Sequence, residues 1–417
     1  MSDLLKVGDI VQLQRGTTYK SALLGENGPV LLGLATISPH GGFRSDNFKR
    51  YSGESPSKLL LKSGDLYVSL KDVTQNTSLL GAIARVPEKI DQGRVTQDTV
   101  KLEFISSKIR PSYLYWQLRT PQYRSYCRQR ATGTTTLGLA REDFLNYTIP
   151  TPTAEVELLV DILDKVEELI EANNQINKTL ELMAKAIFKE WFIDFGPVKA
   201  KAEGKKPFGM DDETAALFPD SFEDSELGQI PKGWEVKSLG DISSCFDSKR
   251  VPLSGAEREK RRGIYPYYGA ASHMGNVDDF LFDGTYALMG EDGSVVNEDG
   301  SPVLQYVWGK FWVNNHAHVL TGKDIATEHL LLFLKHIIIT PYVTGAVQPK
   351  LNQSNMNLIP FVKASLSINS TFAKFIEPLF EKLRVNKQEN DLLVQIRDLL
   401  LPKLISGDLR LAEVANE

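Results

Sequence analysis

The chain has 417 residues, of which 42% are hydrophobic and 24% charged, and a formal charge of −5 at pH 7. This length and composition exclude a disordered or fibrous chain and predict two or three globular domains. The two cysteines, Cys127 and Cys245, cannot form a disulfide framework, so we expect a reducing, cytoplasmic compartment. The N-terminal residues lack the pattern of a signal peptide, and the most apolar run, 329–339, is too short to span a bilayer, so we expect no membrane association.

The first half of the chain alternates short strand patterns with turns and then becomes helical. Strand patterns cover 5–13, 58–70, 79–86 and 99–104. A helix is expected over 111–130, and a long helix over 151–195 with Thr151 as its cap and Pro152 in its first turn. Residues 196–230 are rich in glycine, proline and charge, which predicts a linker.

The second half repeats this order of elements. Strand patterns cover 285–290, 303–314 and 316–320. A helix is expected over 329–338, and a second long helix within 363–406, which Pro402 kinks or ends. Residues 407–417 are left as a C-terminal tail.

Short motifs recur in the same order in the two halves. The pairs are VGDI at 7–10 and LGDI at 239–242, KSGDLYV at 62–68 and FDGTYAL at 282–288, Thr-Gly at 132–133 and 344–345, and Ile-Pro at 149–150 and 359–360. The period of about 210–230 residues indicates a duplicated domain rather than a solenoid, whose units are far shorter. We therefore predict an α+β fold with an internal pseudo-twofold repeat, in which two α/β domains, 1–150 and 231–362, are joined by two long helices.

Both long helices carry apolar residues at heptad spacing, which predicts an antiparallel coiled coil between them. The predicted contact positions of the first helix are Leu159, Ile162, Val166, Leu169, Asn173, Ile176, Leu180, Met183 and Ile187. Those of the second helix are Ile376, Leu379, Leu383, Leu393, Ile396 and Leu400. A buried Asn173 would define the register at some cost in stability.

The charges are segregated along the chain. Residues 101–130 hold seven basic residues and one acidic residue, whereas 155–171 hold seven carboxylates and one lysine. A second basic segment, 247–262, holds six basic and three acidic residues. Any one run is typical of a solvated surface, but two basic segments at similar places in the two halves point to an anionic partner.

The sequence lacks a recognisable catalytic constellation. It has no nucleotide-binding P-loop and no methyltransferase-type motif. Pro219-Asp220 with Asp247-Ser248-Lys249 resembles a nuclease pattern only weakly, and His316 with His318 is more typical of structural histidines than of a metal site. A standalone nuclease or methyltransferase with an unrecognised active site stays as the alternative.

Cations interleaved with aromatic and amide side chains favour DNA recognition instead, because Arg and Lys suit phosphates and guanine while Gln and Asn suit adenine. The aromatic residues among them are equally well explained as core. The candidate DNA-binding residues are Arg44, Lys49, Arg50, Lys71, Lys249, Arg250, Tyr267, Tyr268, Ser272, His273, Gln348, Lys350 and Asn352.

Several long segments resemble the specificity (S) subunits of type I restriction-modification systems. They include EANNQINKTLELMAKAIFKEWFIDFGPVKAKAEG at 171–204, YPYYGAASH at 265–273, GKFWVNNHAHVL at 309–320, TGAVQPKLNQSNMNLIP at 344–360 and QIRDLLLPKLISGDLRL at 395–411. The first half is similar only in outline, and Thr136 stands where the second half has Gln348.

The resemblance implies two target-recognition domains that each contact one half of a split, asymmetric DNA sequence, with the two long helices as a spacer. It implies no catalysis and no cofactor in this chain. It further implies two modification subunits that bind S-adenosylmethionine and methylate adenine at N6, and restriction subunits that use ATP and magnesium.

Overall fold

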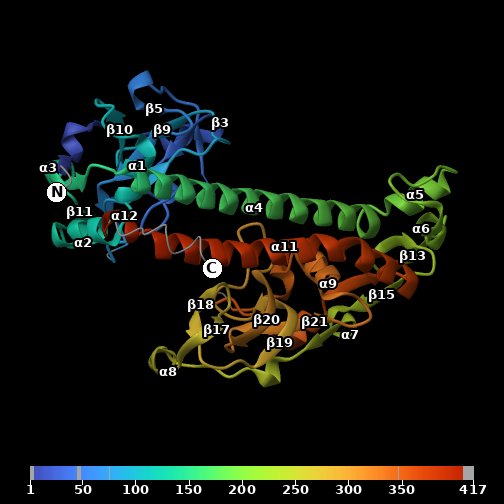
Figure 1. The fold of residues 1–417 in the computed structure, drawn as a ribbon. Helices are drawn as coiled ribbons and strands as arrows, with labels where there is room; N and C mark the ends of the chain where they lie inside the picture. The colour runs from blue at the N-terminus through green and yellow to red at the C-terminus, as the bar shows by residue number, and fades with distance from the viewer. Residues whose placement is uncertain (1–3, 45–47, 75, 346, 407–417) are drawn as a thin grey trace, which may run out of the picture. The chain divides into compact units, whose positions relative to one another are not determined.

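The computed structural model describes residues 4–44, 48–74, 76–345 and 347–406. Its contacts divide the chain into two compact units: unit 1 takes the chain up to Ala172 and from Glu389 onward, and unit 2 takes Asn173–Gln388. Two long helices, α4 (Ala154–Phe192) and α11 (Leu366–Leu400), continue through this division, so each contributes one end to each unit (Figure 1). The expected tail, 407–417, lies outside the described residues.

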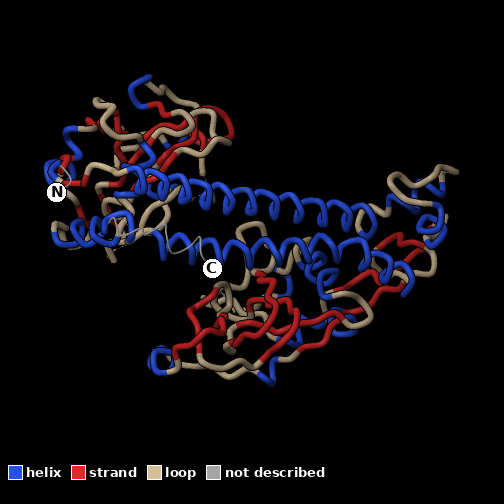
Figure 2. The backbone as a smooth tube through the Cα atoms, in the orientation of Figure 1, coloured by secondary structure: helices blue, strands red, loops and turns tan. Residues whose placement is uncertain are grey.

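Unit 1 is built on two small sheets that carry short helices (Figure 2). The first sheet has antiparallel strands in the order β2-β10-β6-β8, and the second has the order β4-β3-β9-β5, in which β3 and β9 run parallel. The strands are β2 (Val11–Arg15), β3 (Leu24–Leu32), β4 (Arg50–Tyr51), β5 (Leu60–Leu61), β6 (Leu66–Ser69), β8 (Ile83–Arg85), β9 (Gly93–Val95) and β10 (Thr99–Phe104). Alternating apolar residues of the first sheet, such as Val68 and Val100, share one buried core with Trp116.

The helix expected over 111–130 is two helices, α1 (Pro111–Gln117) and α2 (Pro121–Gln129). The break falls at Thr120, whose side chain caps α2 by accepting a hydrogen bond from the Tyr123 amide. Proline at the first position of a new helix explains why the chain stops and restarts there.

Unit 2 is built on one six-stranded sheet in the order β16-β21-β19-β20-β17-β18, in which only β17 and β20 pair in parallel. The strands are β16 (Ser243–Cys245), β17 (Arg262–Tyr268), β18 (His273–Val277), β19 (Phe282–Gly290), β20 (Leu304–Val313) and β21 (Ala317–Gly322). Helix α9 (Thr327–Leu334) packs on this sheet, and its leucines join the buried core that includes Phe372 and Ile376 of α11.

The two units repeat one topology. The order β2-β10-β6-β8 corresponds to β16-β21-β19-β20, and the register is kept as well, since Leu66 pairs with Arg85 as Ala287 pairs with Tyr306. Strands β8 and β9 together occupy the place of the single long β20, which is why one sheet of unit 2 becomes two sheets in unit 1. The predicted mixed α and β fold with an internal repeat is therefore confirmed.

A two-stranded ladder closes each unit just before its long helix. In unit 1 it pairs β1 (Leu4–Lys6) with β12 (Thr148–Pro150), and in unit 2 it pairs β15 (Glu235–Ser238) with β22 (Pro360–Lys363). The repeated Gly-Asp-Ile motifs follow β1 and β15, and the repeated Ile-Pro motifs lie at β12 and β22. These ladders explain why the two motifs recur together.

In unit 2, α4 and α11 pack in opposite directions. Asn177 Oδ1 accepts a 2.9 Å hydrogen bond from Asn386 Nδ2, and the rings of Phe188 and Phe372 lie 6.2 Å apart. Because the residue number on α11 falls as that on α4 rises, the contact is antiparallel, as the sequence predicted.

The predicted contact stripe of α4 is wrong at every second position. Leu159, Val166 and Asn173 are buried, and Leu180 and Ile187 are half-buried. The exposed ones are Ile162 at 39%, Leu169 at 49%, Ile176 at 42% and Met183 at 47%, and the residues buried one place later are Leu163, Asn177 and Ala184. Both sets fit a helical repeat. The less hydrophobic set is the buried one, because Asn177 makes a hydrogen bond with Asn386 and because the side chain of Ala184 is small.

Most of the predicted positions of α11 are buried or half-buried. Ile376, Leu383 and Leu393 are buried, and Leu379 and Leu400 are half-buried. Ile396 is 44% exposed, so its predicted packing role is wrong. The cap predicted for α4 also moves, because α4 begins at Ala154 and Thr153 Oγ1, not Thr151, accepts from the Val156 amide at 3.4 Å.

The segment 196–230 is folded rather than an open linker. It contains α5 (Gly196–Ala202), α6 (Asp212–Leu217) and a hairpin of β13 (Phe222–Ser225) with β14 (Gly228–Pro231). Val198 and Phe218 are buried in the unit 2 core. A few apolar residues spaced through a polar, glycine-rich segment were enough to fold it.

The basic run 101–130 and the acidic run 155–171 neutralise each other within unit 1. Arg110 pairs with Glu157 and with Asp161, and Arg119 pairs with Glu167 at 2.5 Å. These pairs join α1 and its flanks to α4. Two arginines of the first basic segment are therefore paired with carboxylates of α4.

Candidate nucleic-acid interface

A buried polar cluster lies at one edge of the unit 2 sheet, and we call its members, Asp247, Arg250, Glu291 and His318, the Glu291 cluster. Asp247 and Arg250 lie in the turn after β16, Glu291 follows β19, and His318 lies on β21. The strand order makes β16, β21 and β19 neighbours and so brings these side chains together. Their exposed fractions lie between 1% and 15%.

Every member of the cluster has a partner. His318 Nδ1 lies 2.5 Å from Asp247 Oδ2, and His318 Nε2 lies 2.8 Å from the carbonyl oxygen of Leu351. Arg250 Nη1 donates to Glu291 at 2.7 Å and to the Ala317 carbonyl at 2.6 Å. Burial by itself raises the pKa of Asp247, but the hydrogen bond with His318 and the nearby Arg250 outweigh burial and hold that pKa below its ordinary value. The cluster is a network of hydrogen bonds and ion pairs, and it extends to Lys350, whose Nζ lies 3.6 Å from Glu291 Oε1.

Cys245, Asp247 and His318 place one donor atom each within 4.8 Å of one another, the spacing of a metal site. However, Arg250 lies 3.3 Å from the same Asp247 oxygen, and its positive charge opposes a second cation there. Burial and the Asp247 carboxylate raise the pKa of Cys245 to about 12, so the thiol stays protonated near neutral pH and is a poor nucleophile. His316 pairs separately with Asp292, so the two histidines do not converge.

The Glu291 cluster holds an exposed loop, 344–350, against the sheet. Thr344 and Lys350 exchange two backbone hydrogen bonds of 2.8 Å, and the Leu351 amide donates to the Glu291 carbonyl at 2.8 Å. Gly345 has a φ of +87°, and a Cβ there would lie 2.3 Å from the Gln348 carbonyl oxygen, so the turn requires glycine. Three predicted DNA-binding side chains, Lys249, Gln348 and Lys350, are exposed around this loop and the neighbouring turn.

Unit 1 has the same loop over a different support. Thr132 and Gly138 exchange backbone hydrogen bonds of 2.9 and 2.8 Å, and the Leu139 amide donates to the Leu70 carbonyl at 2.9 Å. By strand register, Leu70 and Val100 occupy the places of Glu291 and His318, so these two places are apolar in unit 1, although the loop also pairs with the buried Asp72. The predicted Lys71 is adjacent to this loop and pairs with Asp98 at 2.8 Å.

Three predicted DNA-binding side chains serve the fold instead. Arg250 is enclosed in the Glu291 cluster, and Tyr267 is 1% exposed with its hydroxyl accepting from the Leu253 amide at 3.0 Å. Asn352 caps α10 (Gln353–Asn357) by accepting from the Asn355 amide at 2.8 Å. The sequence could not separate these roles, because arginine, tyrosine and asparagine serve structural and recognition purposes equally well. Tyr268 is half-buried, with its ring 5.8 Å from that of His273.

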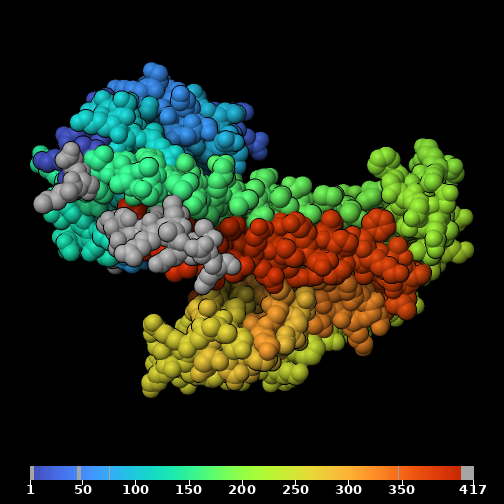
Figure 3. All heavy atoms as spheres, viewed as in Figure 1, coloured from blue at the N-terminus to red at the C-terminus, as the bar shows by residue number. Residues whose placement is uncertain are grey.

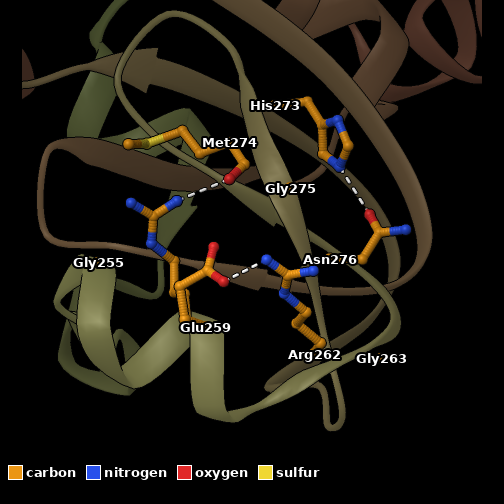
Figure 4. Close-up of a pocket in the computed structure, with 9 residues that line it drawn as sticks. Gly255, Glu259, Arg262, Gly263, His273, Met274, Gly275 and Asn276 are labelled. Carbon is orange, nitrogen blue, oxygen red and sulfur yellow. Dashed lines mark hydrogen bonds and ion pairs between the residues drawn. The ribbon is translucent and has the colours of Figure 1, made fainter.

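A second polar group lies at the other edge of the unit 2 sheet, where α8 (Gly255–Lys260) and the β17–β18 pair surround an open cavity of about 600 Å³ (Figure 4). Arg262, His273 and Asn276 line it, and His273 Nε2 lies 2.7 Å from Asn276 Oδ1. Ser272 and His273, predicted from the sequence, are exposed here. Arg262 and Asn276 were not among the predicted residues, although the run of exposed polar residues along both strands is the signal that marks them.

Three of the four predicted DNA-binding residues of the first half lie beside the β3–β4 pair of unit 1. Arg50 is on β4, and its Nη1 donates to the Gly28 carbonyl at 2.9 Å. Lys49 precedes it and is exposed, and Arg44 is exposed in the segment before. These cations therefore gather near the strand pair that corresponds to β17–β18 in unit 2.

Comparison with known proteins agrees with this architecture. Residues 3–182 and 231–395 match the family described as the type I restriction modification DNA specificity domain. The chain is 28% identical over 353 residues to the type I restriction enzyme MjaIX specificity subunit of Methanocaldococcus jannaschii, covering 80% of this chain and 76% of that protein. It is 25% identical over 430 residues to the HindI specificity subunit of Haemophilus influenzae, covering 87% of this chain and 90% of that protein.

Among solved structures, the S subunit of a type I restriction-modification system from M. genitalium shares the fold, with a TM-score of 0.58 at 16% identity over 97% of this chain and 96% of that chain. The duplicated sheet and paired long helices define a DNA-recognition protein of two similar units. The chain belongs to the family of type I restriction-modification specificity subunits, which recognise DNA sequence and are not catalytic. Family membership decides against a standalone nuclease or methyltransferase. Within the described part of the chain, no helix has the length and apolar character to cross a membrane.

Proposed function

We propose that this chain directs a type I restriction-modification complex to a bipartite, asymmetric DNA sequence, with unit 1 contacting one half-site and unit 2 the other. The observation that supports this proposal best is that one strand order occurs twice while the exposed side chains differ. Two similar units suit two similar positions along a duplex. Unlike side chains suit unlike base sequences, because base edges are distinguished by the donors and acceptors that meet them.

The proposal assigns to DNA the exposed and half-buried candidate residues that the fold does not enclose. They are Arg44, Lys49, Arg50, Lys71, Lys249, Tyr268, Ser272, His273, Gln348 and Lys350. Most protein contacts to DNA go to phosphates, so the lysines are assigned first to the backbone.

The chemistry belongs to partner subunits in this proposal. Two modification subunits bind S-adenosylmethionine and methylate adenine at N6 after flipping it from the duplex. Restriction subunits use ATP and magnesium to translocate and cleave DNA. The assembled complex acts on double-stranded DNA in the cytoplasm.

The misassigned residues of α4 supply a docking surface for the modification subunits. Ile162, Leu169, Ile176 and Met183 recur every seven residues and are exposed, which gives α4 an apolar stripe beside its buried one. In Figure 3 the surface of α4 is visible along the helix. A heptad stripe facing solvent is typical of a helix that packs on further helices. Leu169→Lys should abolish co-purification with the modification subunit, whereas the matched exposed change Glu168→Lys should not.

Exchange of one domain tests independent recognition. We expect replacement of residues 1–150 by the equivalent residues of a relative to change one half of the methylated sequence only. Sequencing that detects methylated adenines in host DNA measures this result. A change in both halves would contradict recognition by separate units.

Insertion into a long helix tests the spacer. Four residues inserted into α4 lengthen it by about 6 Å, close to two base-pair steps. We expect the gap between the two half-sites to lengthen while the half-sites stay the same. An unchanged gap would show that the helices do not set it.

A further inference from the structure

The outer strand pair of each unit is the feature in which the two units agree in topology and differ in chemistry. In unit 1, β3 runs parallel to β9 and carries β4 on its other side. In unit 2, β17 runs parallel to β20 and carries β18 in the same way. Both pairs lie at the end of the strand order and contain a register shift.

The loops 132–138 and 344–350 behave differently, because their backbone hydrogen bonds agree although their sequences share only the opening Thr-Gly. Both begin with Thr-Gly, and both close with the same pair of backbone hydrogen bonds. An element that is alike in both units suits what is alike in both half-sites, namely the sugar-phosphate backbone. An element that differs between the units suits what differs, namely the bases.

The β17–β18 pair is built for contact with a ligand rather than for packing. Six successive residues, 271–276, are exposed along β18 and the turn before it, and Ile264 on β17 is 78% exposed. Edge strands are normally short, charged or covered, so an open edge of this kind calls for a partner. Figure 4 shows Arg262, His273 and Asn276 around the cavity between the two strands and α8.

The cavity side chains differ in how firmly they are held. Arg258 donates to the Met274 carbonyl at 2.6 Å, and Arg261 pairs with Asp278 at 2.8 Å, so both guanidinium groups are engaged by the fold. Arg262 is 74% exposed, and its ion pair with Glu259 is a surface pair, which contributes little to stability. Arg262 can therefore leave Glu259 for a stronger partner at little cost.

A two-stranded β-ribbon fits the major groove of DNA. There an arginine pairs best with guanine O6 and N7, an asparagine pairs best with adenine N6 and N7, and an apolar side chain contacts the thymine methyl. Arg262, Asn276 and Ile264 supply one side chain of each kind on a single ribbon.

We infer that the β17–β18 ribbon enters the major groove of one half-site and that Arg262, His273 and Asn276 contact base edges there. The inference rests on the proposed function, because it requires that unit 2 binds DNA. It assigns base recognition to the ribbon and leaves the 344–350 loop to the backbone.

The test uses the complete complex with its modification subunit in a host free of adenine methylation, followed by sequencing of methylated adenines. Arg262→Ala and Asn276→Ala should each relax one or two positions of one half-site. Discrimination at those positions should fall by about tenfold to hundredfold, the range for one bidentate base contact. The other half-site should stay unchanged. Lys260→Ala is the matched control, because Lys260 is an exposed cation of α8 that does not line the cavity.

Three results would overturn the inference. The first is an unchanged methylated sequence in both variants while their thermal denaturation matches the wild type. The second is a loss of affinity in Arg262→Ala that is uniform across sequences and reduces the salt dependence, which marks a phosphate contact. The third is a wild-type complex that leaves no two-part methylated sequence, which would overturn the proposed function as well and is thereby distinguished from the first two.

Discussion

Units 1 and 2 hold the same loop over different side chains at two corresponding places. In unit 2 the loop 344–350 lies on the ion pairs of Glu291 and His318, whereas in unit 1 the loop 132–138 lies over Leu70 and Val100. The backbone hydrogen bonds of the two loops are nevertheless alike. The duplicated fold therefore retains the backbone path of the loop. The buried side chains beneath the loop can change, provided that each buried polar group finds a hydrogen-bond partner.

Each unit is joined to a long helix by an ion pair, and the positions of the arginine and the carboxylate are reversed between the two units. In unit 1 the arginine is on the globular part and the carboxylate is on the helix, since Arg119 pairs with Glu167 of α4. In unit 2 the helix carries the arginine, since Arg384 of α11 pairs with Glu328. A tyrosine joins each pair, and Arg384 also pairs with Glu377 at 2.7 Å.

The largest expected effect follows from this reversal. Glu167→Ala leaves Arg119, whose side chain is 6% exposed, without its carboxylate, and we expect a loss of about 3 kcal/mol in the stability of unit 1. Glu328→Ala should cost about 1 kcal/mol, because Arg384 is 19% exposed and keeps Glu377. Hydrogen exchange of the amides of each unit measures the two effects separately. Equal losses of stability in the two variants would contradict the expected difference between the two ion pairs. Glu168→Ala, an exposed change on α4, serves as the control.

Replacement of His318 by the residue of the other unit tests the two supports directly. His318→Val places a valine where unit 1 has Val100, but it removes one partner of the buried Asp247 carboxylate and the partner of the Leu351 carbonyl. We expect a loss of about 2–3 kcal/mol and faster exchange of the Lys350 amide. The matched change His316→Val, at a side chain that is 49% exposed, should cost under about 0.5 kcal/mol. A neutral His318→Val would show that the ion pairs are dispensable.

A third comparison concerns pH. Tyr113 of α1 and His329 of α9 both occupy the third position of their helix, and both are 0% exposed. The Tyr113 hydroxyl donates a hydrogen bond to the Pro150 carbonyl, whereas the His329 ring nitrogens have no hydrogen-bond partner. Burial lowers the pKa of His329 from 6.5 to about 3, so the unfolded chain binds a proton below pH 6.5 that the folded unit does not.

Stability from this histidine is therefore complete above about pH 6.5 and is lost as the pH falls toward about 3. We expect unit 2 to lose about 2 kcal/mol between pH 7 and pH 5 from this group alone. His329→Leu should remove that part of the pH dependence, as denaturation at several pH values would measure. An unchanged slope in the variant would assign the effect to other groups.

The smallest expected effect lies in the helix pair. Asn386→Leu breaks the bond to Asn177 and should cost about 1 kcal/mol. The double change Asn177→Leu with Asn386→Leu should recover that loss, because Asn177 Nδ2 and Asn386 Oδ1 have no partner even in the native pair. A double-mutant cycle measures the coupling, and simple additivity of the two losses would contradict it.

The sequence predicted those features of the fold that repeat along the chain. The strand patterns, the duplication and both long helices were predicted, because periodicity and repeated motifs are local properties of the chain. The contact stripe of α4 was not predicted correctly. The less hydrophobic set, which includes Asn177 and Ala184, is buried, whereas the more hydrophobic set, which includes Ile176 and Met183, faces solvent. For the candidate site, Lys249, His273, Gln348 and Lys350 are exposed and stay predictions, whereas Arg250 and Tyr267 are enclosed by the fold.

Asp247, Glu291 and His318 show why the rest of the site was out of reach. They come from three strands far apart in the chain and meet only because β16, β21 and β19 are neighbours in the sheet. Arg262 and Asn276 likewise become a pair of candidates only when β17 and β18 form one ribbon around a cavity.

The sequence by itself determined that the chain is a duplicated protein with two long amphipathic helices, because repeated motifs and helical spacing are visible without a fold. Only the tertiary structure decided which charges are buried in ion pairs and which face solvent. The reason is physical: the cost of burying a charge depends on the partner that strand order brings beside it, and the sequence does not record that partner.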